Sequence, residues 1–397
     1  MLARLRGSDA ATPWLAAGLL LALAVGAPLV VLGPGNDLDV ANVFRSGRSI
    51  ARHFAYLPSR APGSPVHETI VGVLDLIGGP LLTNLASMAA AVVLVLALDR
   101  LLRREGIGPG GRWAVALVAA NPWFLIAATS TTDYLFALAF VIGAALALRA
   151  DRTVLAGALA AAAMGCRIGS VFLVIALLVA ELGEPDRPGA ARRVMVTGLT
   201  TAATTALLFL PSVVQAGGLA FADNDFSTST PLVQLGRAAV KDLTLLGPVA
   251  SVVALAAVPA LLAALRTWRA SWLVRFAVVG LVGSQLLFIR FPWKVPHLLP
   301  CLVCGAILLA VALGDRPRLL VALVVLQLLF AVVRVDVVQP DDPNQATGGD
   351  PGLVVGWGPV VTDWQCRRQD PDAYLGRQKF EVEDAWNCAR PFGTGPD

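Results

Sequence analysis

Residues 153–182 read TVLAGALAAAAMGCRIGSVFLVIALLVAEL, a stretch of 30 residues in which two apolar runs meet at Arg167. Arginines flank this stretch on both sides, at positions 149, 152, 187, 192 and 193. Because the basic residues of a membrane protein gather on the cytoplasmic side, both flanks belong on one side, and the chain between them crosses an even number of times. The pattern therefore predicts two short helices, 153–166 and 167–182, with Arg167 at the tip between them.

The tip of this hairpin is a candidate functional position. At 1.5 Å per residue each helix is about 21–24 Å long, whereas the hydrocarbon core of a bilayer is about 30 Å thick. The tip then lies below the outer surface, where non-helical backbone is tolerated only if it lines protein or a wet cavity. We therefore expect Arg167 to face a site.

Apolar runs of this kind recur along the whole chain. The 397 residues are 56% hydrophobic and 15% charged, with a mean hydropathy of +0.71, whereas soluble domains are about 45–50% apolar and about 25% charged. This composition excludes a soluble enzyme, a disordered chain, a secreted disulfide scaffold and a nucleic-acid module. It predicts an all-α polytopic membrane protein with about eleven transmembrane helices, at 14–33, 81–99, 113–130, 133–149, 153–166, 167–182, 194–212, 243–265, 272–289, 298–313 and 319–335.

The distribution of charge predicts the orientation. If the N-terminus is cytoplasmic, the inside segments hold 16 basic and 8 acidic residues, a formal charge of +8, which leaves −4 outside because the whole chain carries +4. This difference satisfies the positive-inside rule. We expect a multi-pass protein of the plasma (inner) membrane with its N-terminus cytoplasmic and its C-terminus extracytoplasmic. The first run is too long for the apolar region of a cleavable signal peptide, so it is expected to be a retained anchor.

Three segments outside the predicted helices lie on the outer face. They are a large first loop at 34–80, a second loop at 213–242 and a tail at 336–397. The tail is rich in Pro, Gly and Trp and is not expected to form a helix. The chain is accordingly divided into a transmembrane domain, 1–335, and a small extracytoplasmic C-terminal tail.

The first outer loop carries two carboxylates, Asp37 and Asp39, directly after the first predicted span. Carboxylates at this place can act as a general base or as ligands of a cation. Residues 40–52 after them can form an amphipathic helix in the headgroup plane. The alternative is that one of the two aspartates only caps the N-terminus of that helix.

Other charged residues of the outer face are expected to lie near this pair. Each has a structural alternative, with Asp133 as a helix cap and Arg167 and Lys294 as cations that extend to the interface. Taken together, however, carboxylates and cations converge on one face, which suits a substrate that carries a phosphate. The candidate substrate-binding residues are Arg60, Asp133, Arg167, Lys294 and His297.

With these motifs the chain resembles the type C (GT-C) superfamily of membrane glycosyltransferases, which includes protein O-mannosyltransferases, aminoarabinose transferases and bacterial polyprenyl-phosphate-mannose-dependent mannosyltransferases. The resemblance covers residues 14–335. Its motifs are the Asp-x-Asp after the first span, Ser-Arg-x-Pro-Gly-x-Pro at 59–65, the outer-turn Asp133, the arginine after a short Gly/Ala-rich span, and Pro-x-Lys-x-Pro-His-Leu-Leu-Pro at 292–300. Many members have a directly adjacent Asp-Glu, whereas Leu38 separates the acids here, so the choice of base stays open.

The resemblance implies an enzyme that moves a sugar from a polyprenyl-phosphate donor to an acceptor hydroxyl on the outer face. Asp37 matches the first acidic position and is the expected base, with Asp39 at the second. The chemistry agrees with the residue types, because a carboxylate accepts the hydroxyl proton while cations hold the departing phosphate. A single displacement predicts inversion at the anomeric carbon. The candidate phosphate-holding cations are Arg60, Arg167, Lys294 and His297.

The expected partners are a lipid-linked sugar donor, membrane lipids and a glycan, glycolipid or protein acceptor, with no nucleic acid. No organic cofactor is expected, and the sequence leaves the need for a divalent cation open. The alternative function is a membrane transporter or a lipid flippase without glycosyl transfer. Transporters tend to place ionisable residues near the bilayer midplane and to show repeated halves, whereas the charges here lie at span ends and no repeat is visible.

The cysteines and the tail tryptophans carry weaker signals. Cys301 and Cys304 form a C-x-x-C inside an apolar span and are expected to be packing residues. Cys366 and Cys388 lie in an oxidising compartment, where a disulfide between them is one of two alternatives. The tail tryptophans are expected to form the core of a small cap, with sugar stacking as the alternative, at positions 357, 364 and 386.

Overall fold

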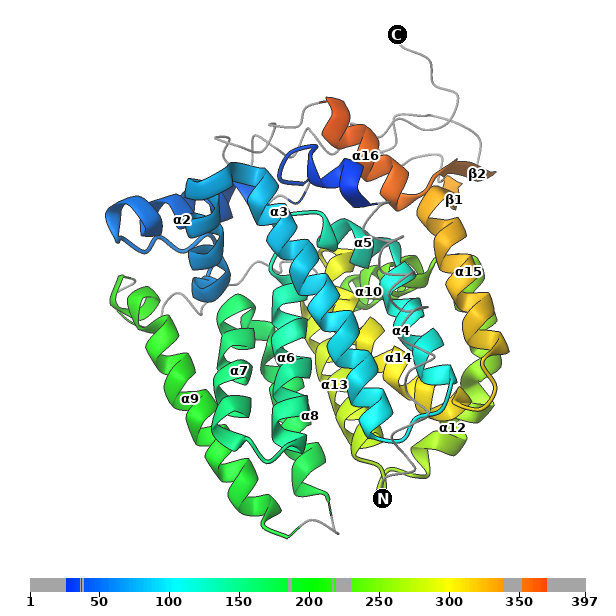
Figure 1. Cartoon of the computed structure of the whole chain (residues 1–397). Coiled ribbons are helices and arrows are strands. Elements are labelled where there is room, and N and C mark those ends of the chain that lie inside the picture. The colour runs from blue at the N-terminus through cyan, green and yellow to red at the C-terminus, as the bar shows by residue number, and fades with distance from the viewer. Residues whose placement is uncertain are drawn as a thin grey trace.

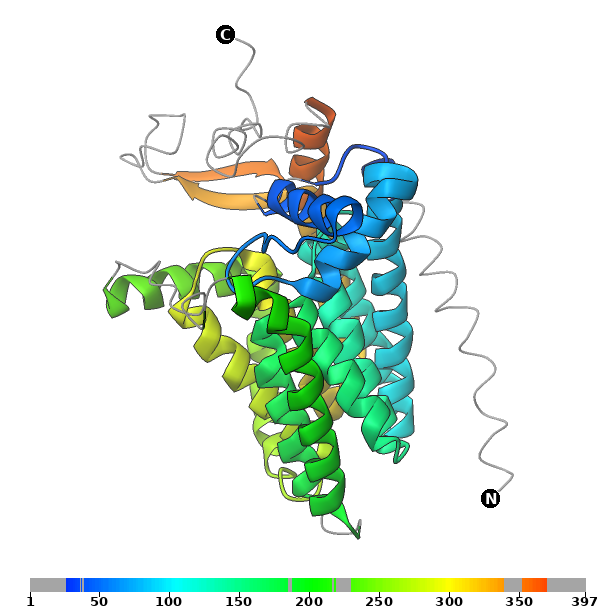
Figure 2. The same cartoon turned by 90° about the vertical axis from the view of Figure 1, so that its left-hand side faces the viewer.

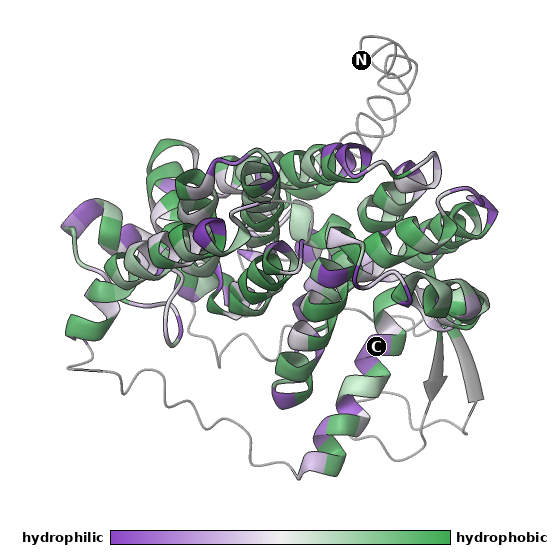
Figure 3. Ribbon diagram, turned by 90° about the horizontal axis from the view of Figure 1, so that it is seen from below, coloured by the Kyte–Doolittle hydropathy of each residue, from purple (hydrophilic) through white to green (hydrophobic). Residues whose placement is uncertain are grey.

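The computed structural model describes residues 26–35, 37, 39–184, 188–215, 218, 230–338 and 352–369. Helices dominate this part of the chain, and a two-stranded sheet lies at one end of the bundle that they form (Figures 1 and 2). Seen along the bundle, apolar residues make up most of the helical ribbon (Figure 3). The first predicted span, 14–33, is described only from residue 26 onward.

The elements of the chain follow one another in this order: α2 (Val40–His53), α3 (Pro65–Arg104), α4 (Gly110–Ala120), α5 (Pro122–Ala128), α6 (Tyr134–Arg149), α7 (Thr153–Cys166), η3 (Ile168–Ser170), α8 (Val171–Leu182), α9 (Ala190–Gln215), α10 (Pro231–Leu246), α11 (Pro248–Ala254), η5 (Leu255–Ala257), α12 (Val258–Leu265), α13 (Trp272–Arg290), η6 (Val295–Leu298), α14 (Leu299–Leu313), α15 (Arg318–Val332), β1 (Val333–Val338), β2 (Gly352–Trp357) and α16 (Pro359–Gln369).

The ten predicted spans from residue 81 onward fall on helices, except that residues 333–335 of the last one begin β1. Within the described residues, five helices are long and apolar enough to cross a membrane, or six if the bent pair α4 and α5 counts as one span. Four further apolar stretches have 10–17 residues. The architecture is therefore that of a multi-pass helical membrane protein, and the number of eleven crossings stays a prediction.

The predicted hairpin is present as α7 and α8, joined by the 3-10 turn η3. Arg167 lies between the helices with extended backbone (φ −153°, ψ 110°), so the tip is non-helical as expected. Small residues bring α7 close to its neighbour α9. A Cβ at Gly157 would lie 2.6 Å from Cβ of Thr200, so the two backbones approach each other as only glycine allows.

One predicted span, 113–130, is broken in the structure. It consists of α4 and α5, which meet at an angle of 65°. Pro122 has no N–H for a helical hydrogen bond, and the residue before a proline avoids the helical region. Asn121 is accordingly extended, and its Oδ1 accepts from the N–H groups of Trp123 and Phe124, which starts α5 in a new direction.

A second span starts later than predicted. The run 243–265 is interrupted at Gly247, whose backbone is left-handed (φ 79°), and Pro248 then begins α11. A Cβ at Gly247 would lie 2.9 Å from the ring of Phe330. The apolar segment that can cross a membrane is therefore Pro248–Leu265. The first residues of the predicted span, 243–246, belong to the separate helix α10.

The tail contains regular structure that the sequence did not predict. β1 and β2 pair in an antiparallel manner, with Val333 opposite Trp357 and Val338 opposite Gly352, and α16 follows. The expectation that the tail forms no helix is therefore wrong for α16. Cys366 is disulfide-bonded, whereas Cys388 and Trp386 lie outside the described residues.

The end of the bundle opposite the tail holds ion pairs between helix termini. Arg149 at the end of α6 binds Glu105 with Nε–Oε1 at 2.7 Å, and Arg193 on α9 binds Glu181 at 2.5 Å. These residues belong to the segments predicted to be cytoplasmic. Ionic contacts at this end fasten the helices to one another.

Candidate active site

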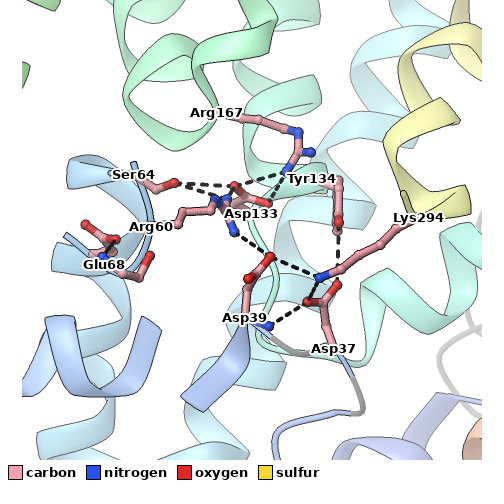
Figure 4. A network of polar contacts seen from close by, with 10 residues as sticks. Asp37, Asp39, Arg60, Ser64, Glu68, Asp133, Tyr134, Arg167 and Lys294 are labelled. Atoms are coloured by element: carbon pink, nitrogen blue, oxygen red, sulfur yellow. Dashed lines mark hydrogen bonds and ion pairs between the residues drawn. The ribbon is translucent and has the colours of Figure 1, made fainter. Parts of the chain in front are cut away.

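Six of the seven predicted site residues meet at the end of the bundle near the tail (Figure 4). Five separate connections supply them. Asp37 and Asp39 precede α2, Arg60 follows it, and the others come from the turns between α5 and α6, α7 and η3, and α13 and η6, as Asp133, Arg167 and Lys294. The residues are far apart in sequence, so the fold assembles the cluster.

Lys294 joins the two first-loop carboxylates. Its Nζ donates to Oδ1 of Asp37 at 2.5 Å and to Oδ2 of Asp39 at 3.0 Å. The backbone N–H of Asp39 also donates to Oδ1 of Asp37 at 2.9 Å, which fixes the two residues relative to each other. Both carboxylates therefore face the same cation, although Leu38 separates them in sequence.

Arg60 links this pair to a third carboxylate. One end of its guanidinium donates to Oδ2 of Asp39 at 3.2 Å, and the other donates to Asp133 and to Oγ of Ser64. Asp133 also accepts from Nη1 of Arg167 at 3.1 Å. The result is a chain of alternating charge that runs from Asp37 through Lys294, Asp39, Arg60 and Asp133 to Arg167.

The electrostatics of this chain are balanced, with three cations and three carboxylates at neutral pH. Burial lowers the pKa of the Arg60 guanidinium, but Asp133 and Asp39 outweigh it and raise that pKa above its usual value. Burial raises the pKa of Asp133, but the charges of Arg60 and Arg167 lower it, and the net result is a pKa below the usual value. Lys294 behaves like Arg60, because burial lowers its pKa while Asp37, Tyr134 and Asp39 together raise it by more. All three groups are therefore held in their charged forms.

Asp39 and Asp133 do not cap their helices through their side chains, which was the structural alternative for each. Asp39 and Asp133 occupy the N-cap positions of α2 and α6, but neither side chain accepts a hydrogen bond from the N–H groups of its own helix. Both carboxylates bind the cations of the site instead. Lys294 likewise ends in the cluster, with its side chain only 13% exposed.

His297 lies beside the chain of charges and not in it. Its ring centroid is 5.8 Å from that of Tyr134, at an interplanar angle of 44°. The ion pairs of the cluster are made by Arg60, Arg167 and Lys294, and His297 is linked to the site by its contact with the Tyr134 ring. Its predicted role in holding phosphate stays a prediction.

Tyr134 is a site residue that the sequence did not single out. Its hydroxyl donates to Oδ2 of Asp37 at 3.4 Å, and the guanidinium of Arg167 lies 4.4 Å from its ring centroid. The residue directly follows Asp133, and its place at the start of a helix after the outer turn is the signal that would have found it. Tyr134 thereby contacts both ends of the charge chain.

A small pocket opens beside the cluster, lined by Asp37, Asp39, Val40, Val43, Arg60, Thr131, Thr132, Asp133 and Tyr134. A ligand in this pocket would contact Asp37, Asp39 and Arg60. Within the described residues there is no group of three or more His, Cys, Asp or Glu side chains that could hold a metal ion.

Buried polar contacts fix the segment that leads to Asp37. Asn84 of α3 donates through Nδ2 to the carbonyls of Val30 at 3.0 Å and Gly33 at 2.7 Å. The N–H of Thr131 donates to the carbonyl of Pro34 at 2.9 Å. The segment before Asp37 is therefore fastened both to α3 and to the turn that carries Asp133.

The two cysteines of the C-x-x-C lie on α14, outside this cluster. Cys301 and Cys304 are buried on α14 with free thiols. Cys304 packs closely, since a Cβ at Gly280 would lie 2.8 Å from its Sγ. This agrees with their expected role as packing residues.

No protein-family model and no curated protein matches the sequence. Among solved structures, the fold is similar to that of ArnT from Cupriavidus metallidurans in the apo state, with a TM-score of 0.53, 18% sequence identity and coverage of 78% of this chain and 60% of that chain. It is equally similar to ArnT bound to undecaprenyl phosphate (TM-score 0.53, 18% identity, 77% and 61% coverage). ArnT is a GT-C glycosyltransferase. The likeness is one of fold, and the chain spans about three fifths of the length of ArnT.

Proposed function

We propose that this protein is a membrane glycosyltransferase that moves a sugar from a polyprenyl-phosphate donor to an acceptor hydroxyl. The observation that carries the proposal is the chain of three carboxylates and three cations at one end of an apolar bundle. The fold supports it, because the similar ArnT structure holds undecaprenyl phosphate. A lipid phosphate needs cations at the membrane surface, and a sugar acceptor needs a base beside them.

The chemistry requires one base and a bound phosphate. A first-loop carboxylate accepts the proton of the acceptor hydroxyl while that oxygen forms its bond to the anomeric carbon. The bond from this carbon to the phosphate oxygen breaks, and the electron pair leaves with the polyprenyl phosphate, which the cations stabilise without a general acid. A single displacement of this kind inverts the anomeric carbon.

Asp37 is the proposed base. It binds one cation, Lys294, whereas Asp39 binds both Lys294 and Arg60. A donor phosphate that competes for Lys294 would leave Asp37 free to accept a proton while Arg60 still holds Asp39. Asp133 is proposed to keep Arg60 and Arg167 in place and to orient a sugar hydroxyl.

The same proposal includes the orientation of the protein in the plasma (inner) membrane. The site lies at the end of the bundle opposite the ion pairs of Arg149 and Arg193. Basic connections favour the cytoplasmic side for that end, which leaves the site on the outer face. The division into a transmembrane domain, 1–335, and an extracytoplasmic tail, 336–397, is part of the proposal.

The test is a transfer assay with the purified full chain in lipid vesicles and a panel of undecaprenyl-phosphate-linked pentoses and hexoses. Replacing a general base costs about 10²–10⁴ in rate, so Asp37→Asn is expected to lower kcat by about 100-fold or more. Asp39→Asn is expected to weaken binding of the donor and therefore to raise KM. The matched control is Asp75→Asn, because Asp75 binds Arg48 at 2.6 Å outside the cluster.

Full activity in Asp37→Asn would contradict the proposed base, and full activity in Asp39→Asn as well would exclude a base in the first loop. The transporter alternative predicts a different result, namely movement of the lipid-linked sugar across the vesicle membrane with no sugar attached to any acceptor. Measuring both transfer and translocation in the same vesicles therefore separates the two functions.

A further inference from the structure

A buried arginine of the tail contacts the segments that carry the candidate active site. Arg367 on α16 is 1% exposed. Its Nη1 donates to the carbonyls of Thr129 at 2.6 Å and Leu29 at 3.1 Å, and its Nη2 donates to the hydroxyl of Ser130. Asp363 of the same helix binds Nη2 at 2.8 Å, which pairs the buried charge.

The two segments that Arg367 joins are the ones that carry the carboxylates of the site. Leu29 lies in the last helical turn before Asp37, and Ser130 lies in the turn that precedes Asp133. Contacts of α3 join the same segments, since Thr131 Oγ1 donates to Oδ1 of Asn84 at 2.9 Å. Arg367 and α3 therefore both hold the segment before Asp37 against the turn that carries Asp133.

An arginine suits this place for a geometric reason. The carbonyls of Leu29 and Thr129 lie near helix ends, where carbonyls lose their helical partners. That of Leu29 accepts from the N–H of Leu32 at 3.2 Å and, as a carbonyl has two lone pairs, from Arg367 as well. The planar guanidinium presents five N–H donors in a fixed fork, so one side chain reaches two carbonyls and a hydroxyl at once. An ammonium group is a point charge on a flexible stem and fixes less of this geometry.

The fold also fixes where α16 begins. The N–H of Gly358 donates to the carbonyl of Val332 at 2.7 Å. A Cβ at Gly358 would lie 2.2 Å from the carbonyl oxygen of Phe330, so only glycine allows this approach. The start of α16 is thereby fixed on the end of α15, and the helix extends over the outer end of the bundle (Figure 1).

We propose that Arg367 is a positioning residue of the active site, and that α16 completes the site although it belongs to the tail. Arg367 acts by fixing the segment before Asp37 relative to the turn before Asp133. The base and the cations then keep the spacing that the reaction needs. This inference rests on the proposed function for its catalytic part, whereas its structural part stands on the contacts alone.

The experiment compares Arg367→Gln, Arg367→Lys and the control Arg368→Gln in the full chain, in lipid vesicles. Arg368 is the neighbouring arginine, but it is exposed and lies over the ring of Trp364. Two quantities are measured for each variant. One is the deuterium uptake of the amides in segments 29–35 and 127–134, and the other is kcat and KM for an undecaprenyl-phosphate-linked sugar.

Arg367→Gln is expected to raise deuterium uptake in both segments, with helices far from the site unchanged. A displacement of about 1 Å at a catalytic group costs about 100-fold in rate, so kcat is expected to fall about 10- to 100-fold while KM stays within about 3-fold. Arg367→Lys is expected to recover part of kcat. Arg368→Gln is expected to match the wild type in both measurements.

Unchanged uptake and unchanged kcat in Arg367→Gln would overturn the inference, as would a rise in uptake that is equal throughout the molecule. If Arg367→Gln does not fold, Ser130→Ala decides the question, because it removes the hydroxyl acceptor of Arg367 together with one local hydrogen bond to the carbonyl of Ile126. An unchanged kcat and unchanged uptake in that variant would also overturn the inference. A wild-type protein without transfer activity refutes the proposed function, whereas the uptake measurement still decides whether Arg367 organises the site.

Discussion

Asp133 is the most buried carboxylate of the charge chain, and like Asp39 it binds two of the three cations. Its side chain is 3% exposed and contacts Arg60 and Arg167. Replacing it with Asn keeps its size but removes the charge that both arginines face. The expected loss is larger than for an exposed ion pair, since two partly buried guanidinium groups lose their partner.

We expect Asp133→Asn to lower the free energy of unfolding by about 2 kcal/mol, a value reduced from that of a fully buried pair because the arginines are partly exposed. Thermal unfolding in detergent measures this. The control is Asp99→Asn, whose partner Arg103 is 44% exposed, so a change below about 1 kcal/mol is expected. An equal loss of unfolding free energy in the two variants would show that the ion pairs of Asp133 contribute no more than an exposed pair.

The lowered pKa of Asp133 also predicts how its contribution depends on pH. A carboxyl whose pKa is lower in the folded than in the unfolded state stabilises the fold fully above the unfolded value of about 3.9, and less as pH falls through the folded value. The cause is the pair of arginines, which outweighs burial. The stability difference between wild type and Asp133→Asn should thus be constant from about pH 5 to 7 and shrink below about pH 4. A difference that grows on acidification would contradict this sign.

At the scale of elements, the position of Asp39 depends on how α2 crosses α3. Asp39 is the residue from which α2 starts, and the helix lies against α3 through two glycines. A Cβ at Gly47 would lie 2.7 Å from the backbone N of Gly72, and one at Gly72 would lie 2.1 Å from the carbonyl oxygen of Gly47. The two backbones are in contact, so there is no flexible side chain that could give way.

Gly47→Ala is therefore expected to push α2 away from α3 and to move Asp39 away from Arg60. Overpacking of this kind costs about 1–3 kcal/mol, and transfer activity should fall with it. Gly236→Ala on α10 is the control, because nothing lies within 4 Å of a Cβ there. Its stability should stay the same or rise slightly, since alanine is a better helix former than glycine. Wild-type kcat in Gly47→Ala would show that α2 does not position Asp39.

The helices themselves were largely predictable, because apolar length alone locates them. The hairpin of α7 and α8 followed from the arginines on both sides of it, and Arg167 lies at its non-helical tip as predicted. The breaks at Asn121 and Gly247 were not predicted, although Pro122 and Pro248 mark both in the sequence. The average hydropathy of a segment hardly changes when it contains one proline, whereas the proline bends or breaks the helix at that point.

The site was predictable as a set of residues but not as a set of contacts. Charged residues are rare in this chain, so their presence in the segments predicted to be extracytoplasmic was informative in itself. Which cation binds which carboxylate depends on how five connections meet, and no spacing in the sequence encodes that. Arg367 shows the limit most clearly, because it lies in a segment rich in Pro, Gly and Trp and contacts residues 237 and 338 positions earlier in the chain.

At the scale of the whole molecule, the remaining question is which end of the bundle faces the cytoplasm. The charge chain occupies one end, and the arginine-rich connections occupy the other (Figures 1 and 4). A lipid-linked donor that presents its sugar outside the cell requires the charge chain to face outward. The positive-inside rule independently gives the same orientation.

Single cysteines at Arg368 and at Asp315 test this orientation in intact cells with a membrane-impermeant thiol reagent. Arg368 is exposed on α16, and Asp315 lies in the connection between α14 and α15 at the opposite end. The native thiols of Cys166, Cys301 and Cys304 are buried, so they give little background. We expect labelling of the cysteine at position 368 in intact cells, and of the one at 315 only after the membrane is opened. The reverse pattern would place the charge chain in the cytoplasm and would exclude an acceptor outside the cell, whereas transfer measured in detergent would be unaffected.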